Sequence, residues 1–186
     1  MDPGSRLRLG RDDETSGGIT VVRAIAVPPP QRGVEPALNG GVAYRVISCR
    51  GRIMVEIVWQ KWFELGNFRI DSEHRVFLDL VMGLNRDHYA GITPEKQARS
   101  LKEILKYAEF HFLSEENMMI DIDYPDRKIH EDEHRRLLAR LEGSVARLNA
   151  GEDILDEFLT FLYEWFCEHT VGIDYRLAQF IAARTG

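Results

Sequence analysis

The sequence predicts an all-α protein: an antiparallel up-down-up-down four-helix bundle with a largely disordered N-terminal extension. Two observations predict the bundle. Apolar residues recur with helical spacing in four successive segments after residue 53, and the connections between these segments are short, roughly five residues, so neighbouring helices must run antiparallel. A change of composition near residue 53 predicts the extension. We therefore divide the chain into residues 1–53 and a bundle domain of residues 54–186.

Residues 1–53 have the composition of a segment without a core of its own. They hold five of the seven prolines and eight of the fifteen glycines, and their eight Arg face five acidic residues in a chain of net charge −6. This composition predicts disorder or loose attachment, with pairing of the apolar runs at 21–27 and 42–47 as one or two strands as the alternative. Translation from Met54 is a further hypothesis, which N-terminal sequencing of the native protein tests.

The first two expected helices begin at recognisable signals. An apolar stripe covers residues 70–84, and Asp71 is placed to cap its start. A second stripe covers residues 101–119 and follows Thr93 and Pro94, a typical helix start.

The last two expected helices follow the same pattern. The third stripe, over residues 130–148, begins just after Tyr124 and Pro125. The fourth, over residues 155–169, begins near Asp153. Four amphipathic helices with one apolar face each are enough to enclose a bundle core.

Polar residues interrupt each stripe where an ordinary core would be apolar. Taken singly, each has an ordinary explanation, such as a hydrogen-bonded core histidine or a carboxylate at the rim. In an antiparallel bundle, however, all of these positions fall at the same end of the molecule. Burying so many groups without partners is costly, whereas metal ions satisfy every lone pair at once. The residues are His74, His111, Glu115, His130, His134 and His169.

Two further residues refine this prediction. His88 lies about 21 Å along the helix axis from His74 at 1.5 Å per residue, too far to join the cluster, and is expected at a helix end or on the surface. Asp174 follows His169 by five residues, a spacing that does not share a helical face. Gly172 would let the helix unwind there, so that Asp174 returns over the cluster from a loop as a second carboxylate.

Composition narrows the class of protein and its partners. No stretch approaches the roughly 18 apolar residues of a membrane span. The net charge of −6 argues against nucleic acid or an anionic membrane as the main partner. Two cysteines, Cys49 and Cys167, cannot form a disulfide framework. We therefore expect a soluble, cytoplasmic protein.

Four motifs contain the candidate metal-binding residues: Ile-Asp-Ser-Glu-His at 70–74, His-Phe-Leu-Ser-Glu-Glu at 111–116, Tyr-Pro at 124–125 followed by His130 and His134, and Trp-x-x-x-His at 165–169 followed by Asp174. With these motifs, the run from Trp59 to Ala178 resembles a bacterial hemerythrin. All seven positions that bind metal in that family carry the expected residue type, and residues 1–53 lie outside the resemblance. Glu73 stands where many bacterial members have Gln, and we expect it to be exposed.

The resemblance implies a non-heme di-iron centre that binds O₂ reversibly. His130, His134 and His169 would bind one iron. His74 and His111 would bind the other, and Glu115, Asp174 and an oxo or hydroxo group would bridge the two. One iron would then lack a ligand, and O₂ would bind there. The candidate lining residues of an O₂ pocket are Phe112, Trp165 and Phe166, for which ordinary core packing is the alternative.

Several functions fit such a centre. The leading prediction is an O₂-carrying, storing or delivering protein that is not an enzyme. A second is a sensor or interaction module, in which O₂ or redox state alters a partner through residues 1–53. An unknown O₂-receiving or signalling protein would be the partner. A third is a weak di-iron oxidoreductase acting on peroxide, nitric oxide or ferrous iron, for which turnover abolished by His111→Ala would be diagnostic. A fourth is a structural zinc site.

Overall fold

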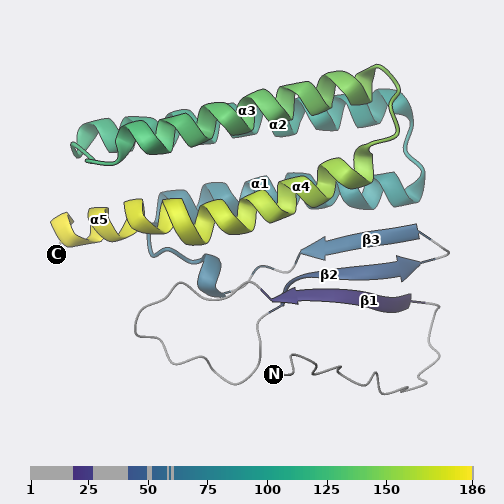
Figure 1. The fold of residues 1–186 in the computed structure, drawn as a ribbon, viewed down its shortest axis with the longest axis horizontal. Helices are drawn as coiled ribbons and strands as arrows, with labels where there is room; N and C mark the ends of the chain where they lie inside the picture. Colours follow the sequence, from purple (N-terminus) through teal and green to yellow (C-terminus); the bar gives the residue numbers. More distant parts are fainter. Residues whose placement is uncertain (1–18, 27–41, 50–51, 58, 60, 186) are drawn as a thin grey trace, which may run out of the picture.

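The computed structural model describes residues 19–26, 42–49, 52–57, 59 and 61–185, and its main body is four long helices in two layers (Figure 1). Helix α1 (Phe68–Ala90) lies beside α4 (Leu155–His169), and α2 (Pro94–Asp121) lies beside α3 (Arg127–Asn149). Successive helices run in opposite directions, which confirms the predicted up-down-up-down bundle. No helix among the described residues is both long and apolar enough to cross a membrane.

The start of α1 differs from the prediction in its capping residue. The helix begins at Phe68, and the Asn67 side chain accepts the two backbone N–H groups that open the first turn. Asp71 already lies inside this turn and binds the preceding loop instead, accepting the N–H groups of Leu65 at 2.7 Å and Gly66 at 3.1 Å. Asp71 was therefore the wrong choice of cap, because the helix starts three residues before it.

Helices α2 and α3 begin where the sequence predicts. The Thr93 hydroxyl accepts the N–H of Lys96 at 3.3 Å, and Pro94 is the first helical residue. Helix α3 begins at Arg127, two residues after Pro125.

Two apolar clusters fill the bundle, one on each side of a polar layer. The larger cluster lies between the four helices and includes Leu101, Leu141 and Leu162, each fully buried. In α1, His74 lies between Phe77 of this cluster and Ile70 of the second cluster. The second cluster closes the end of the bundle with Leu65, Ile70, Met119, Tyr124, Leu177 and Ala178.

Part of the N-terminal extension forms a three-stranded antiparallel sheet. The strands pair in the order β1-β2-β3, and β3 lies next to α1 and α4 (Figure 1). The pairing of β1 with β2 matches the alternative interpretation of the runs at 21–27 and 42–47 as strands, because β-branched residues in these runs favour extended backbone. Strand β3 also crosses the composition boundary at residue 53. The disorder predicted for residues 1–18, 27–41 and 50–51 lies outside the described residues. The strand bounds are β1 (Ile19–Ala26), β2 (Val42–Cys49) and β3 (Arg52–Ile57).

Candidate metal centre

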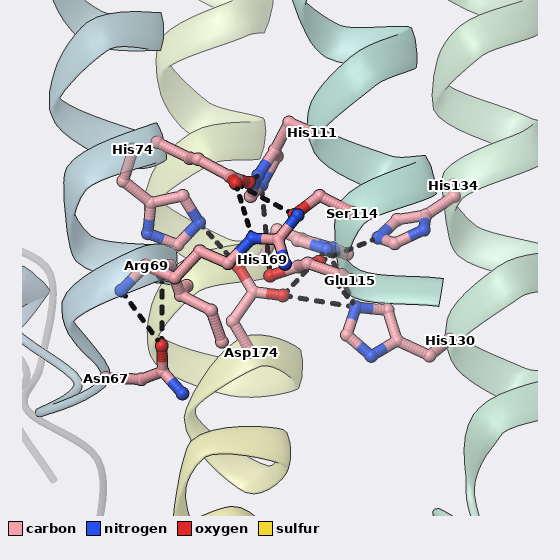
Figure 2. A network of polar contacts seen from close by, with 12 residues as sticks. Asn67, Arg69, His74, His111, Ser114, Glu115, His130, His134, His169 and Asp174 are labelled. Atoms are coloured by element: carbon pink, nitrogen blue, oxygen red, sulfur yellow. Dashed lines mark hydrogen bonds and ion pairs between the residues drawn. The ribbon is translucent and has the colours of Figure 1, made fainter. Parts of the chain in front are cut away.

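Seven side chains from all four bundle helices and the turn after α4 converge in one buried layer (Figure 2). None of them is more than 4% exposed. They are the seven residues that the sequence predicts for a metal site, and the fold brings every one of them into the same layer. Helix α1 supplies His74, α2 supplies His111 and Glu115, α3 supplies His130 and His134, α4 supplies His169, and the following turn supplies Asp174.

Local helix geometry places the ligand candidates. His111 and Glu115 are four residues apart, as are His130 and His134, so each pair shares one helical face. Asp174 reaches the layer differently from the loop that we expected. Residues Thr170–Asp174 form a π-helical turn in which the N–H of Tyr175 bonds to the carbonyl of Thr170. The wider turn brings a residue five positions on back over His169, and the helix continues as α5 (Tyr175–Thr185).

The Glu115 carboxylate lies between the histidines of two neighbouring helices. Its Oε2 is 3.3 Å from Nε2 of His134 and 3.5 Å from Nε2 of His130. Its Oε1 points the other way and lies 3.9 Å from Nε2 of His111. The two oxygens of one carboxylate thus serve two groups of histidines.

Asp174 divides its oxygens in the same manner. Its Oδ1 is 3.0 Å from Nε2 of His169 and 3.1 Å from Nε2 of His130, whereas its Oδ2 is 3.2 Å from Nε2 of His74. The layer therefore contains a three-histidine group and a two-histidine group, and both carboxylates face both groups.

The donor atoms crowd together inside the layer, where Nε2 of His130 lies 3.3 Å from Nε2 of His169. All four carboxylate oxygens of Glu115 and Asp174 are buried and make no hydrogen bond to the described residues, and the same holds for Nε2 of His111 and His134. Five of the side chains can place one donor atom each within 4.8 Å of the others, and so can His74, His111 and Glu115. Imidazole together with carboxylate suits iron and similar transition metals. The residues present therefore fit a pair of metal ions.

The electrostatics keep both carboxylates ionised. Burial alone would raise the pKa of Glu115 and of Asp174, but the surrounding histidines outweigh burial and lower both. Burial lowers the pKa of His130, yet its contacts with Asp174 and Glu115 raise it to about 9. Burial lowers the pKa of His169 and prevails over the attraction of Asp174. Ionised carboxylates and deprotonated imidazoles are the forms that bind metal.

Two more carboxylates hold the far nitrogens of ligand candidates, and sequence reasoning missed both. Nδ1 of His111 donates to Glu73 at 2.9 Å, and Nδ1 of His134 donates to Glu116 at 3.1 Å. The expectation that Glu73 is exposed was wrong, since it is only 8% exposed. Glu73 lies three residues after Ile70 and four before Phe77, so helical spacing places it on the buried face. This spacing could have predicted its burial.

A small, partly enclosed cavity of about 10 Å³ adjoins the two-histidine group. The three aromatic residues that the sequence suggested for an O₂ pocket all line it. They also pack tightly: the ring of Phe112 stacks on His134 with centroids 4.0 Å apart, and Trp165 stacks on His169 at 4.7 Å. The lining residues are His74, Phe77, Ala108, His111, Phe112, Trp165 and Phe166.

His88 and Cys167 lie outside the cluster. His88 is near the opposite end of α1, where its Nε2 is 3.5 Å from Asp156, and its side chain is 24% exposed. Cys167 is buried in the larger apolar cluster, where burial raises the pKa of its thiol to about 12. The sequence predicted that His88 lies at a helix end or on the surface, and the structure places it there.

The fold and this layer define an antiparallel four-helix bundle with a buried histidine and carboxylate metal site. Residues 66–181 match the family profile described as "Hemerythrin HHE cation binding domain", and the chain belongs to the hemerythrin family. The protein is similar to the bacteriohemerythrin of Stenotrophomonas maltophilia, with 32% identity over 132 residues that cover 70% of this chain and 84% of the relative. It is also similar to the bacteriohemerythrin of Clostridium acetobutylicum, with 30% identity over 122 residues, or 63% and 95% of the two chains.

Solved structures support the same fold. A crystal structure of wild-type hemerythrin superimposes with a TM-score of 0.59 at 23% identity and covers 66% of this chain and 95% of its own. A leucine-to-alanine hemerythrin mutant superimposes with a TM-score of 0.62 at 23% identity, over 67% and 95% of the two chains.

Proposed function

We propose that this protein is a non-heme di-iron protein that binds O₂ reversibly and acts as an O₂ carrier or store rather than as an enzyme. The observation that carries the proposal is this small cavity, because it touches His74 and His111, the group with fewer protein ligands. A diatomic ligand needs an open coordination position next to a space that admits it.

The proposed ligand set follows the two groups of donors. His130, His134 and His169 would hold one iron, and His74 and His111 the other. Glu115 and Asp174 would bridge them together with an oxo or hydroxo group. The division of each carboxylate's oxygens between the two groups supports this assignment. The iron pair, when bound, supplies the electrons that O₂ binding draws on.

The chain's own residues would protect that state by excluding water. Phe112, Trp165 and Phe166 line the cavity, and Phe166 also packs edge-on against His74 with centroids 5.4 Å apart. Five histidines and only two carboxylates also put less negative charge on the metals than the glutamate-rich sites of di-iron oxidases do. Both features favour reversible binding over oxidation of another substrate.

A sensing role is the second candidate. Strand β3 lies against α1 and α4, the helices that carry His74 and His169. A change at the metal layer thus has a short route to the N-terminal sheet and to a signalling or O₂-receiving partner bound there.

An optical spectrum tests the proposal. Iron-loaded protein is reduced without air, exposed to O₂ and then purged with argon. A visible charge-transfer band that appears with O₂ and disappears under argon is the expected result. A band that stays favours sensing or redox chemistry. No band, with two irons per chain confirmed by metal analysis, contradicts the open O₂ site.

A further inference from the structure

A buried carboxylate outside the seven ligand candidates forms the second contact of His111. We propose that Glu73 is a positioning residue that fixes the His111 imidazole and, through its negative charge, shifts the iron pair toward the ferric state. This inference rests on the proposed di-iron centre, though not on reversible O₂ binding.

The hydrogen bond sets the orientation of the ring. Nδ1 of His111 donates to Oε2 of Glu73 at 2.9 Å, which leaves Nε2 as the nitrogen with a free lone pair. That Nε2 faces the metal layer, 3.9 Å from Oε1 of Glu115, and has no hydrogen-bond partner among the described residues. A carboxylate behind a ligand imidazole makes it a better electron donor to a metal.

The surroundings of Glu73 are built for a charged carboxylate. Its Oε1 accepts from the Ser114 hydroxyl at 2.8 Å and from Nε of Arg69 at 3.1 Å, so both oxygens are occupied by donors. The Tyr107 hydroxyl donates to the Glu73 carbonyl at 3.1 Å and ties the same residue to α2. A glutamine offers one oxygen and one N–H₂ group, so it cannot accept from every donor here.

Burial makes the charge effective. The side chain of Glu73 is 10% exposed, whereas that of its main counter-charge, Arg69, is 55% exposed and lies largely in water. A negative charge in a poorly screened position stabilises the higher charge state of nearby metal ions. Glu73 is therefore expected to lower the reduction potential and to shorten the life of the reduced protein in air.

Glu116 provides a matched comparison within the same site. It accepts from Nδ1 of His134 at 3.1 Å, so it plays the same part in the three-histidine group. Its side chain is 30% exposed and thus better screened. The two carboxylates differ in burial and in their other partners, because Glu73 also accepts from Ser114 and Arg69. These differences predict unequal effects of the same substitution.

The test measures the reduction potential by spectroelectrochemistry in anaerobic iron-loaded protein, for the wild type, E73Q, E116Q and R69Q. E73Q is expected to favour the ferrous form by about tenfold, a rise of about 59 mV for one electron. It should also slow oxidation in air. E116Q should shift the potential in the same direction by a smaller amount. R69Q should shift it the opposite way, because it removes a positive charge and leaves Glu73 in place.

The outcomes separate this inference from its alternatives. An E73Q protein with two irons per chain and an unchanged potential overturns it, as does an E116Q shift of equal size. If E73Q fails to fold or to keep iron, R69Q decides: a lowered potential supports the inference, and an unchanged one overturns it. A wild type with an iron pair but no reversible O₂ band overturns only the proposed function. A wild type that binds no iron pair overturns both.

Discussion

The two ends of the bundle use the same helical stripes for opposite chemistry. At one end the inward positions carry the buried histidines and carboxylates of the metal layer. At the other end equivalent positions carry Leu84, Leu101 and Leu155, each at most 2% exposed. The histidine of that second end, His88, sits outside the core beside Asp156. The comparison teaches that apolar packing at one end can hold the four helices together. The other end can then bury the polar side chains of a metal site.

The largest expected effect is loss of the di-iron spectrum when one of the two carboxylates proposed to bridge the irons is removed. Glu115→Ala should abolish the bridged di-iron spectrum. Among the described residues, only Glu115 and Asp174 have a carboxylate that faces both histidine groups. Asp174→Ala should do the same. His88→Ala is the matched control and should leave the spectrum and two irons per chain intact. An unchanged spectrum in either carboxylate variant would refute the ligand assignment.

The π-helical turn offers a second way to break the metal end alone. Deleting Gly172 should convert Thr170–Asp174 into regular helix and rotate Asp174 by about 100° away from the layer. Iron content should fall below two per chain while far-ultraviolet circular dichroism stays helical. The control is deletion of Gly151 in the exposed connection between α3 and α4, which should spare the iron. A Gly172 deletion that retains a normal spectrum would contradict the role of the turn.

Folding stability of the metal-free protein and metal affinity should change in opposite directions as the pH rises. In the metal-free protein the pKa of His130 is raised to about 9 by Asp174 and Glu115 in spite of burial. Its stabilising contribution is complete below its unfolded pKa of about 6.5 and is lost as the pH rises through about 9. Metal must displace this proton, so affinity should rise up to about tenfold per pH unit between pH 7 and 9.

Zinc titrations by calorimetry in two buffers of different ionisation enthalpy would count the released protons. His169, whose pKa is lowered by burial, should contribute none at neutral pH. Metal affinity that is flat over this range would show that His130 is already neutral in the metal-free protein.

Most of the fold could be predicted because apolar stripes and proline-containing helix starts depend on residues close together in the sequence. Thr93 and Pro94 define the start of α2 through the backbone groups of one helical turn. The seven ligand candidates could be predicted because helical spacing and antiparallel order fix which positions meet. Asp71 was misplaced because two polar residues, Asn67 and Asp71, both suit a helix start and only the structure shows where the helix begins.

Other features depended on contacts that no local pattern specifies. The role of Glu73 arises from a histidine and a serine on a different helix, His111 and Ser114. The π-helical turn at Asp174 lies where the sequence spacing alone indicates a break in the helix. Strand β1 of the N-terminal extension pairs with β2 across residues 27–41. A composition rich in Gly and Pro hides such pairing.

A substitution in the apolar end should affect stability without affecting the metal. Leu101 is fully buried at the start of α2, far along the helix from His111. Leu101→Ala should lower the free energy of unfolding by about 2–5 kcal/mol through lost burial and a cavity. Urea unfolding of metal-free and metal-loaded protein should give the same loss, with two irons per chain retained. A loss of iron at unchanged fold would mean that the two ends are coupled.

The smallest expected effects come from the helix caps at the two ends. Asn67 caps α1 at the metal end and accepts two N–H groups, at 3.1 and 3.2 Å, whereas Thr93 caps α2 at the apolar end and accepts one at 3.3 Å. Each replacement by alanine should cost about 1 kcal/mol, with the larger share for Asn67→Ala. Both measurements belong in metal-free protein, where metal binding cannot mask the loss. Equal losses would show that a second accepted N–H adds little, and a loss well above 2 kcal/mol for Asn67→Ala alone would show that the cap also holds the Leu65–Gly66 loop against Asp71.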